Sequence, residues 1–253
     1  MLSTDVKKAY DDFYSNNDEA WRMLGARHKA GNIVDVCKGI RPEKVLEVGA
    51  GDGSILHYLD TWNFAPQLYA LEIADSGVEK ILRRKLNRLK DARAFDGYTI
   101  PYPDNHFDLC ILAHVLEHVE HERPLLRELK RVSKHLCIEV PRDYRFDVDK
   151  KVKHFLDYGH INVYTPSSLR FLLKTEGFEI IADKTSVAAP EIISFARFQI
   201  LKQPNTLLSR LKISLEYRLK LLTGKLLGRK KQEAFANAYT VLTTKSAQNL
   251  KIF

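Results

Sequence analysis

Three glycines at alternate positions give this sequence its clearest chemical signal. The turn Gly49–Gly53 follows the apolar run Val45–Val48, and a helical pattern begins at Ser54. Glycine permits positive φ and close backbone approach, and the first amides of a helix present free donors. This order predicts a strand, a cofactor-binding turn and a helix N-terminus. The spacing is G-x-G-x-G, with Glu47 two residues before it, and differs from the dinucleotide fingerprint G-x-G-x-x-G.

Acids follow two later runs of β-like sequence. The run Gln67–Glu72 ends in Glu72, and Asp96-Gly97 follows the weaker run Ala92–Phe95. A carboxylate offers two acceptor oxygens, which suit the two vicinal hydroxyls of a ribose. Each acid also has a structural interpretation, because strand-end acids are commonly solvated and Asp-Gly is a common turn pair.

Two histidine-rich segments follow the later strands. In the first, His114, Glu117 and His118 share one face if the segment is helical, and the spelling H-x-x-E-H is that of an inverted zinc-protease motif. No distant third ligand is evident, and a cluster that merely caps a helix is a further interpretation. The second segment is Gly159–Asn162, in which His160 is able to take up a proton near neutral pH.

Alternating strand and helix patterns must position these residues. The alternation is typical of an α/β fold with a doubly wound, mostly parallel sheet, and Leu109–Ala113 is apolar throughout, as a strand buried on both faces should be. The expected strands are residues 44–48, 67–72, 92–95, 107–113, 136–140, 178–181 and 239–245. The expected helices are residues 4–16, 19–37, 54–60, 77–90, 124–132 and 165–173.

In this order the motifs resemble those of class I S-adenosylmethionine-dependent methyltransferases, over roughly residues 43–185 and closest to the ubiquinone-pathway O-methyltransferase branch. The resemblance implies a seven-stranded, Rossmann-like sheet with an N-terminal helical lid, and S-adenosyl-L-methionine as the cofactor. It also implies that Glu47 orients the glycine turn, that Glu72 holds the ribose and that Asp96 accepts from the adenine amino group. The cofactor-binding residues implied are Glu47, Gly49, Ala50, Gly51, Gly53, Glu72, Ile73, Asp96, Gly97 and Ala113.

The same resemblance places the two histidine segments on the acceptor side of the cofactor. His160 is the first candidate for a general base and His118 the second, although His160 has an equally simple interpretation as a loop-packing residue. Some members of that branch bind a divalent metal with an acid where this chain has His114. Magnesium prefers oxygen ligands, so we assign no metal ligand.

The first 40 residues are expected to form a lid over the cofactor. In this interpretation Arg27 meets the methionine carboxylate and Tyr14 faces the substrate, although aromatic residues at helical spacing are also typical of a core. The residues concerned are Tyr10, Phe13, Tyr14, Trp21 and Arg27. The single domain then comprises a lid (1–40), a methyltransferase core (41–186), a basic helical insertion (187–234) and a final strand with a tail (235–253).

Composition narrows the classes of protein. The chain has 253 residues, of which 45% are hydrophobic and 28% charged, as in ordinary globular proteins. It has no apolar run of 18 residues and no apolar segment near Met1, so we expect a cytoplasmic protein. The three cysteines, Cys37, Cys110 and Cys137, are an odd number, which favours inert buried thiols over a disulfide or metal set.

The inserted segment contains the whole charge excess. Nine basic residues lie between Lys202 and Lys231 against one acid, Glu216, and this excess of eight equals the net charge of the chain. Leucines recur there at steps of three and four, at positions 208, 211, 215, 219, 222 and 226. One interpretation is peripheral membrane contact through residues 204–231; others are an RNA-binding stripe and a helix packed on its own domain or a dimer partner. Few aromatic residues interleave with the cations, which argues against nucleic acid.

We therefore expect transfer of a methyl group to an oxygen or nitrogen nucleophile of a non-protein acceptor, of small-molecule, lipid-linked or glycan chemistry. An RNA methyltransferase is one alternative, although Leu112-Ala113-His114-Val115 stands where base N-methyltransferases have an Asn-Pro-Pro-Tyr type of tetrapeptide. A non-catalytic module that binds the cofactor is the other. The sequence names neither the acceptor nor the oligomeric state.

Overall fold

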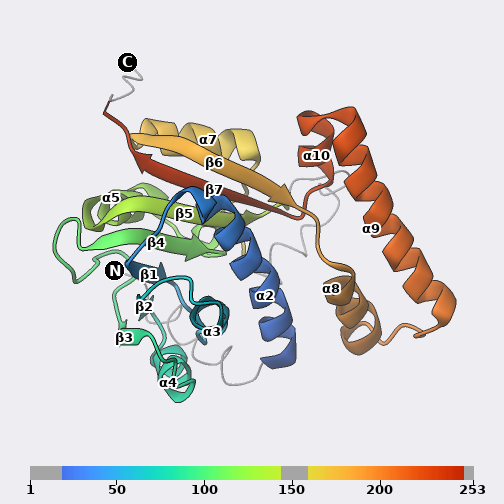
Figure 1. Cartoon of the computed structure of the whole chain (residues 1–253), viewed down its shortest axis with the longest axis horizontal. Coiled ribbons are helices and arrows are strands. Elements are labelled where there is room, and N and C mark those ends of the chain that lie inside the picture. Colours follow the sequence, from blue (N-terminus) through green and yellow to red (C-terminus); the bar gives the residue numbers. More distant parts are fainter. Residues whose placement is uncertain (1–18, 144–158, 248–253) are drawn as a thin grey trace.

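A seven-stranded sheet forms the centre of the molecule in the computed structural model, which describes residues 19–143 and 159–247 (Figure 1). The strand order is β3-β2-β1-β4-β5-β7-β6, with β7 antiparallel to both of its neighbours and the pairs from β3 to β5 parallel. This confirms the doubly wound, mostly parallel sheet. The strands are β1 (Lys44–Val48), β2 (Gln67–Glu72), β3 (Leu89–Ala94), β4 (Phe107–Ala113), β5 (Ser133–Pro141), β6 (Phe178–Ser186) and β7 (Ala238–Lys245).

Helices cover both faces of this sheet and bury two separate apolar clusters. Helices α2 (Glu19–Val36), α3 (Ser54–Thr61) and α4 (Asp75–Arg83) pack on one face, against side chains such as Leu109 and Ile111 of β4. Helices α5 (Glu122–Val132) and α7 (Pro166–Thr175) pack on the other, against Cys110 and Leu112 of the same strand. Because successive strand residues point to opposite faces, β4 supplies both layers and is apolar without interruption.

The sequence predicted most elements to within a few residues, but the helix predicted over residues 77–90 is wrong at its C-terminal end. Helix α4 ends at Arg83, and Lys85 adopts a left-handed conformation with φ of 49°. The carboxylate of Asp60 then accepts hydrogen bonds from the amides of Asn87 (3.0 Å) and Arg88 (2.9 Å). These long-range bonds hold the chain away from the helical path, so that β3 begins at Leu89, earlier than predicted.

All three cysteines are buried and free, which confirms the expectation of core thiols. Burial raises the pKa of Cys110 to about 12. The hydrogen bond with Cys37, together with burial, raises the pKa of Cys137 well above its ordinary value. Neither residue is therefore available as a thiolate at neutral pH.

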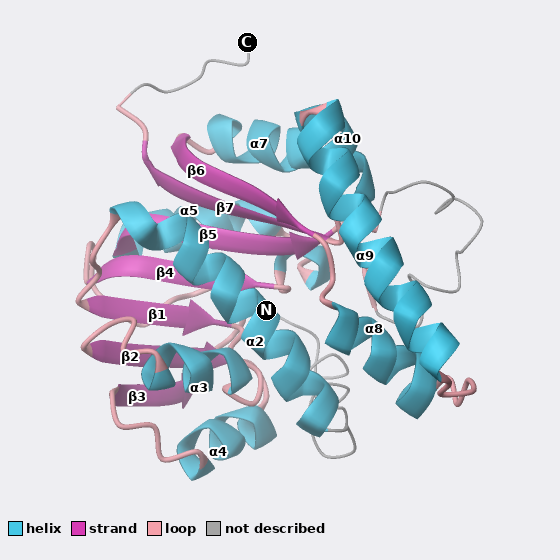
Figure 2. Cartoon of the chain, turned by 45° about the vertical axis from the view of Figure 1, so that its right-hand side comes forward, coloured by secondary structure: helices cyan, strands magenta, loops and turns pink. Residues whose placement is uncertain are grey.

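The inserted segment forms a helical arm beyond the carboxyl ends of the parallel strands (Figure 2). The arm consists of α8 (Pro190–Phe195), a π-helical turn η4 (Ala196–Ile200), α9 (Leu207–Leu227) and α10 (Arg229–Phe235). Within residues 19–143 and 159–247, no helix has both the length and the apolar character required to cross a membrane.

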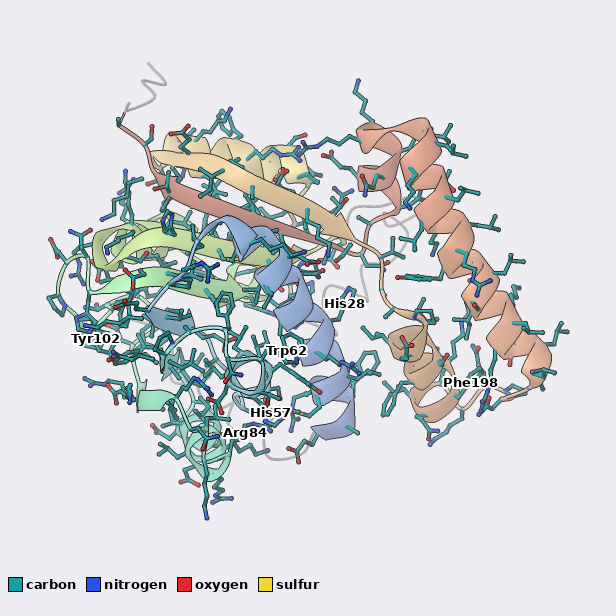
Figure 3. The ribbon with its side chains drawn as sticks, in the orientation of Figure 1. His28, His57, Trp62, Arg84, Tyr102 and Phe198 are labelled. Atoms are coloured by element: carbon teal, nitrogen blue, oxygen red, sulfur yellow. The ribbon has the colours of Figure 1, made fainter. Side chains whose placement is uncertain are left out.

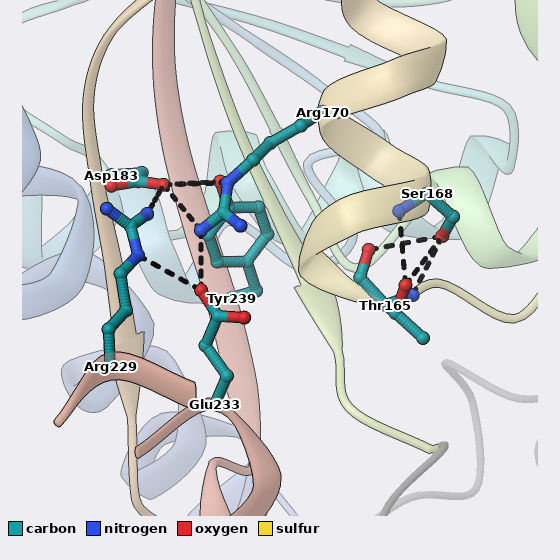
Figure 4. A network of polar contacts seen from close by, with 7 residues as sticks. All are labelled: Thr165, Ser168, Arg170, Asp183, Arg229, Glu233 and Tyr239. Atoms are coloured by element: carbon teal, nitrogen blue, oxygen red, sulfur yellow. Dashed lines mark hydrogen bonds and ion pairs between the residues drawn. The ribbon is translucent and has the colours of Figure 1, made fainter. Parts of the chain in front are cut away.

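A polar network fastens the C-terminal end of this arm to the sheet (Figure 4). Asp183 of β6 pairs with Arg229 of α10, and Arg170 of α7 bridges Asp183 (2.8 Å) and Glu233 of α10 (2.7 Å). The hydroxyl of Tyr239, on β7, donates to Asp183 at 2.7 Å. Arg229 is exposed, but Arg170, Asp183 and Glu233 are largely shielded from water, so their ion pairs fix α10 more firmly than fully exposed pairs would.

Candidate active site

The glycine turn and the histidine segments meet at the carboxyl edge of β1 and β4. At this point the strand order changes direction, because β1 is followed on one side by β2 and on the other by β4. Loops that leave neighbouring strands toward opposite faces leave a crevice at such a position, which is where open α/β sheets bind ligands. The topology therefore brings together segments that are far apart in the sequence.

The glycine turn has the backbone geometry expected of it. Gly49, Gly51 and Gly53 all have positive φ, at 71°, 59° and 75°. The amides of Gly49 and Ala50 both donate to the carbonyl of Leu71, at 2.8 and 3.0 Å, which ties the turn to the end of β2. A Cβ on Gly49 would lie 2.4 Å from Cγ2 of Val115, so the side-chain space there is already filled.

Glu72 lies directly beside this turn. Its Oε2 accepts from the amide of Gly51 at 2.7 Å, and its Oε1 accepts from Ile73 (2.9 Å) and Ala74 (3.2 Å). The residue is buried. Gly77, which the sequence analysis did not single out, makes this possible, because a Cβ there would lie 2.7 Å from Cγ of Glu72 and 2.8 Å from the carbonyl oxygen of Gly51.

Two further acids, Glu47 and Asp52, lie next to the glycine turn. Glu47 of β1 is buried and accepts a hydrogen bond from the amide of Leu56 in α3. Burial and the nearby acids Asp52 and Glu72 raise the pKa of Glu47 well above its ordinary value. Burial acts in the same direction on Asp52, but hydrogen bonds from Ser54 and Arg22 lower its pKa overall.

Asp52 also fastens the lid helix to the turn. It accepts from Nε of Arg22 on α2 at 2.9 Å and from Nη2 of Arg84, at the end of α4, at 3.0 Å. Arg27 is exposed, and its contact with the methionine carboxylate stays a prediction. Tyr10, Phe13 and Tyr14 lie outside the described residues, whereas Trp21 stacks on Phe195 of the arm with ring centroids 5.5 Å apart.

Asp96 closes its own turn. Its Oδ1 accepts from the amides of Tyr98 (2.9 Å) and Thr99 (2.6 Å), and Gly97 has a φ of 88°. The structural interpretation of Asp96 as a turn residue is thus observed, and its adenine contact stays a prediction. Ala113 ends β4 and is buried, while Ile73 is half-buried beside Glu72, so both border the same edge of the sheet.

The segment after β4 is not the α-helix assumed for its shared face. His114 has a φ of 57°, and only Leu116–His118 form one turn of 3-10 helix. The left-handed turn nevertheless keeps the three side chains close, with Nδ1 of His114 3.5 Å from Oε1 of Glu117. A left-handed conformation at a non-glycine residue is sparsely populated and recurs at functional sites. Without the helix of a zinc protease, that interpretation of the motif loses its structural basis.

Glu117 is the least satisfied polar group of the cluster. It is 1% exposed, and neither of its carboxylate oxygens has a hydrogen-bond partner within the described part of the chain. Burial raises its pKa to about 7. Burial also lowers the pKa of both His114 and His118 to about 4, so both imidazoles are neutral at pH 7.

His160 faces this carboxylate from the other histidine segment. Its Nδ1 lies 2.7 Å from Oδ2 of Asp143, and its ring meets that of His118 edge-on with centroids 4.9 Å apart. Nδ1 of His118 lies 3.0 Å from the carbonyl oxygen of Gly159. Both rings are therefore oriented through Nδ1, the arrangement that directs the tautomer of a functional histidine.

Asn162 connects the two segments through its hydrogen bonds. Its side-chain amide donates to the carbonyl of Val119 at 2.6 Å, and its backbone amide donates to the carbonyl of Glu117 at 3.0 Å. The sequence analysis assigned Asn162 no role. Its structural task is to hold the His160 loop against the Glu117 turn.

Glu117, His118 and His160 have the spacing of a cation-binding group. One ligand atom of each lies within 4.8 Å of the other two. Two imidazoles and one carboxylate suit a zinc-like cation better than magnesium, which prefers oxygen donors. The sequence alone led to no metal ligand, because the closeness of these three side chains becomes visible only in the folded structure.

Lys29 of α2 is a further residue that the sequence did not identify. Burial lowers its pKa, and the neighbouring carboxylates Glu139, Glu117 and Glu47 act against that shift. Glu139 of β5 is itself held by Asn32 of α2 (3.0 Å) and Thr240 of β7 (2.7 Å). His28 projects from the same helix on the side that faces the arm (Figure 3). A lysine within a helix gives no sequence signal for such a position.

A family model described as a methyltransferase domain matches residues 22–183, which is more than half of the chain and contains every one of these site segments. The chain belongs to the methyltransferase family. Its enzymatic activity is S-adenosylmethionine-dependent methyl transfer.

The relatives are consistent with this membership. A demethylmenaquinone methyltransferase from Thermotoga maritima is 26% identical over 191 residues, covering 64% of this chain and 78% of the relative. The ubiquinone/menaquinone biosynthesis C-methyltransferase UbiE from Cupriavidus taiwanensis is 29% identical over 117 residues, or 44% of this chain and 48% of the relative. The match to UbiE thus spans about half of that protein.

Solved structures share the fold at low identity. Phosphoethanolamine N-methyltransferase 2 from Haemonchus contortus, in complex with S-adenosyl-L-methionine, superposes with a TM-score of 0.62 at 12% identity. That superposition covers 97% of this chain and 60% of the other. It establishes a Rossmann-like methyltransferase fold and gives no information on the acceptor.

The charge of the site fits the cofactor of this methyltransferase. Among the buried acids at this edge of the sheet, Asp52 and Glu139 have pKa values below the ordinary range, and Lys29 lies among the carboxylates. S-adenosylmethionine carries a sulfonium and an ammonium group, which such an acidic surface attracts, whereas it would repel the pyrophosphate of a dinucleotide. The residues present therefore fit S-adenosylmethionine.

Gly49→Ala is expected to lower the free energy of unfolding by about 2 kcal/mol or more, because a Cβ at positive φ would overlap Val115. Urea unfolding followed by circular dichroism measures this change. Gly39→Ala is the matched control, since a Cβ there meets nothing within 4 Å. Equal stability of the two variants would contradict the filled space beside the turn.

Replacing Glu117 by Gln is expected to change how stability depends on pH. Burial raises the pKa of Glu117 to about 7 from an ordinary 4.5. Between these two pH values, the folded chain therefore retains a proton that the unfolded chain releases. The carboxyl group therefore makes the wild type lose free energy of unfolding as pH rises from about 4.5 to about 7, with no further loss above. Glu117→Gln lacks this contribution.

Urea unfolding of both chains at about pH 5, 6 and 8 measures the difference. The stability of the wild type relative to Glu117→Gln should decrease from the first pH to the last. Glu120→Gln, at an exposed position three residues away, is the control. A difference that stays constant over this range would show that Glu117 ionises in its ordinary range.

Proposed function

We propose that this methyltransferase transfers its methyl group to an oxygen or nitrogen nucleophile of a non-protein acceptor, of small-molecule, lipid-linked or glycan chemistry, with His160 as the general base. The observation that carries this proposal is the hydrogen bond between His160 and Asp143, at 2.7 Å, beside the buried carboxylate of Glu117, whose oxygens accept no hydrogen bond from the described residues. The pair lies at the carboxyl edge where the glycine turn also lies.

Asp143 prepares His160 for proton transfer. When Nδ1 donates to Oδ2 of Asp143, the lone pair of Nε2 is left to accept a proton, and the buried carboxylate stabilises the imidazolium that forms. Neutral His118, edge-on to this ring, adds no competing positive charge. His118 therefore serves to orient the acceptor in our proposal, as the second of the two catalytic candidates.

The remaining site residues hold and orient the cofactor. S-adenosylmethionine supplies an electrophilic methyl group when it is bound. Glu72 is assigned to the ribose hydroxyls, Asp96 to the adenine, and Glu47 to the support of the glycine turn through Leu56. Alignment of the acceptor with the methyl group then contributes much of the rate, because proximity replaces a bimolecular encounter.

A carbon nucleophile on a quinol ring is a second candidate acceptor. The two relatives, a demethylmenaquinone methyltransferase and a ubiquinone/menaquinone biosynthesis C-methyltransferase, favour it by the activities in their names. Removal of a ring hydroxyl proton by His160 would make the adjacent ring carbon nucleophilic, so the same base serves both candidates. An RNA acceptor receives no support from the buried acids of the site, which repel phosphate.

Glu72→Gln is expected to weaken binding of S-adenosylmethionine by about tenfold to a hundredfold, because hydrogen bonds to a charged acceptor are lost. Isothermal titration calorimetry measures the dissociation constant. Glu79→Gln, an exposed acid on α4, is the control and should bind as the wild type does. Failure of the wild type itself to bind would remove the cofactor from this chain, and an unchanged affinity in Glu72→Gln would remove Glu72 from the ribose role.

His160→Ala is expected to reduce turnover by about a hundredfold or more, the usual effect of losing a general base, while the affinity for S-adenosylmethionine stays within about twofold. Transfer of a radiolabelled methyl group to a short-chain quinol measures turnover, and the position of the label separates oxygen from carbon transfer. His57→Ala, on α3, is the control, because no interaction links His57 to the histidine cluster among the described residues. Full activity of His160→Ala would end its assignment as the base.

A further inference from the structure

Helix α9 turns its leucine stripe toward solvent. The stripe consists of Leu208, Leu211, Leu215, Leu219, Leu222 and Leu226. Every one of these side chains is at least half exposed, from 51% at Leu222 to 77% at Leu208. A continuous row of exposed leucines over five helical turns is far more apolar surface than an isolated exposed leucine, and such patches mark interaction sites.

The opposite side of α9 packs on the rest of the arm. Ile213 is 1% exposed, and Gly224 is buried where a Cβ would lie 3.2 Å from Cγ of Gln232 in α10. At about 100° per residue, both positions fall roughly opposite the centre of the leucine stripe. The interpretation that the stripe packs on its own domain is therefore wrong, because other residues of α9 make that contact.

Cations border the stripe on both of its long edges. Lys212 lies along one edge, Arg218 and Lys225 lie along the other, and all three are exposed. The one acid of α9, Glu216, is half-buried at the same edge as Lys212 and pairs with Arg197 of η4 at 3.4 Å. The exposed face of α9 is thus apolar in its centre, and the fully exposed charges at its edges are basic.

The arm holds this face in a fixed orientation. At the N-terminal end, Phe195 of α8 stacks on Trp21 of α2. At the C-terminal end, Arg229 and Glu233 of α10 pair with Asp183 and Arg170 of the core (Figure 4). A capping box between Thr206 and Ser209 starts α9 at the tip. The exposure of the leucines is therefore built into the fold.

We propose that α9 is a membrane-docking helix that lies in the interface of an anionic lipid bilayer. The leucines enter the acyl-chain boundary, and Lys212, Arg218 and Lys225 meet lipid phosphates at the level of the headgroups. Charge decides against a second copy of this chain as the occupant. Two such faces brought together would place cations against cations, and the one acid at their edges, Glu216, is already paired with Arg197.

This docking goes beyond the proposed function and does not depend on it, because vesicle binding requires neither the cofactor nor an acceptor. The arm lies beyond the carboxyl edge of the sheet, where the site lies, so docking would bring the site to the membrane surface (Figure 2). The link to a lipid-linked acceptor rests on the proposed function. Loss of turnover with intact vesicle binding would affect that link alone.

Flotation of the full chain with vesicles tests the proposal. The vesicles contain phosphatidylglycerol and phosphatidylcholine in equal parts, and pure phosphatidylcholine vesicles are the comparison. We expect the chain to float with the anionic vesicles and to bind the neutral ones at least about tenfold more weakly. Binding should also decrease as salt is added, since exposed charges are screened.

Two double variants with matched controls separate the apolar contribution from the charge contribution. Leu215→Gln/Leu219→Gln should weaken vesicle binding at least about tenfold, and Arg218→Gln/Lys225→Gln by a similar factor. Leu82→Gln/Ile181→Gln removes equally exposed apolar side chains elsewhere, and Lys90→Gln/Lys174→Gln removes the same charge elsewhere. Both controls should bind as the wild type does, and thermal unfolding of each variant verifies that it folds.

Three outcomes would overturn the proposal. The first is vesicle binding by the leucine variant that equals that of the wild type. The second is absence of vesicle binding together with a dimer, seen by light scattering, that the leucine substitutions dissociate. The third is absence of vesicle binding together with binding of a short RNA duplex that Arg218→Gln/Lys225→Gln abolishes.

Discussion

The burial of several carboxylates along one edge of the sheet is the constraint on which the rest of the structure depends. An ionised acid removed from water is costly unless partners compensate it. This chain compensates each acid differently. Backbone amides hold Glu72, two arginines hold Asp52, and Asn32 with Thr240 holds Glu139. For Glu117 the compensation is incomplete, and its pKa rises instead.

This constraint explains the position of α2 at the carboxyl edge of the sheet. Three residues of α2 serve the buried acids, with Arg22 at Asp52, Asn32 at Glu139 and Lys29 among the remaining carboxylates. The remaining excess of negative charge attracts a cationic ligand, which is what a sulfonium cofactor provides. The same acids that cost free energy on folding thus favour binding, and a site of this kind gives up stability for function.

The structure of the arm depends on a different constraint, the exposure of its leucine side chains. Its outer face leaves leucines in water, which a folded chain avoids when an alternative packing exists. Here the alternative is blocked, because Ile213 and Gly224 already occupy the packed side of α9 and both ends of the arm are fastened to the core. This face could be recognised only from the exposed fraction of each side chain in the structure, because a leucine stripe with flanking cations has the same sequence pattern whether it is packed or exposed.

Sequence reasoning reached the sheet, the glycine turn and Glu72 because local rules govern them. Alternating patterns identify strands, and positive φ requires glycine whatever surrounds it. It failed where distant groups decide the local conformation. The amides of Asn87 and Arg88 donate hydrogen bonds to Asp60, so α4 ends before the residue at which the periodic pattern predicted its end. His114 adopts a left-handed conformation, so its segment does not form the expected helix.

The sequence by itself therefore determined the fold class, the family resemblance and the cofactor, since those depend on the order and spacing of short motifs. Only the tertiary structure decided which polar groups are buried together. It placed Lys29 and Gly77 beside residues that are distant in the chain, and it set His160 against Asp143 and Glu117. The physical reason is that burial and pKa depend on all the elements packed around a side chain, and no window of sequence contains them.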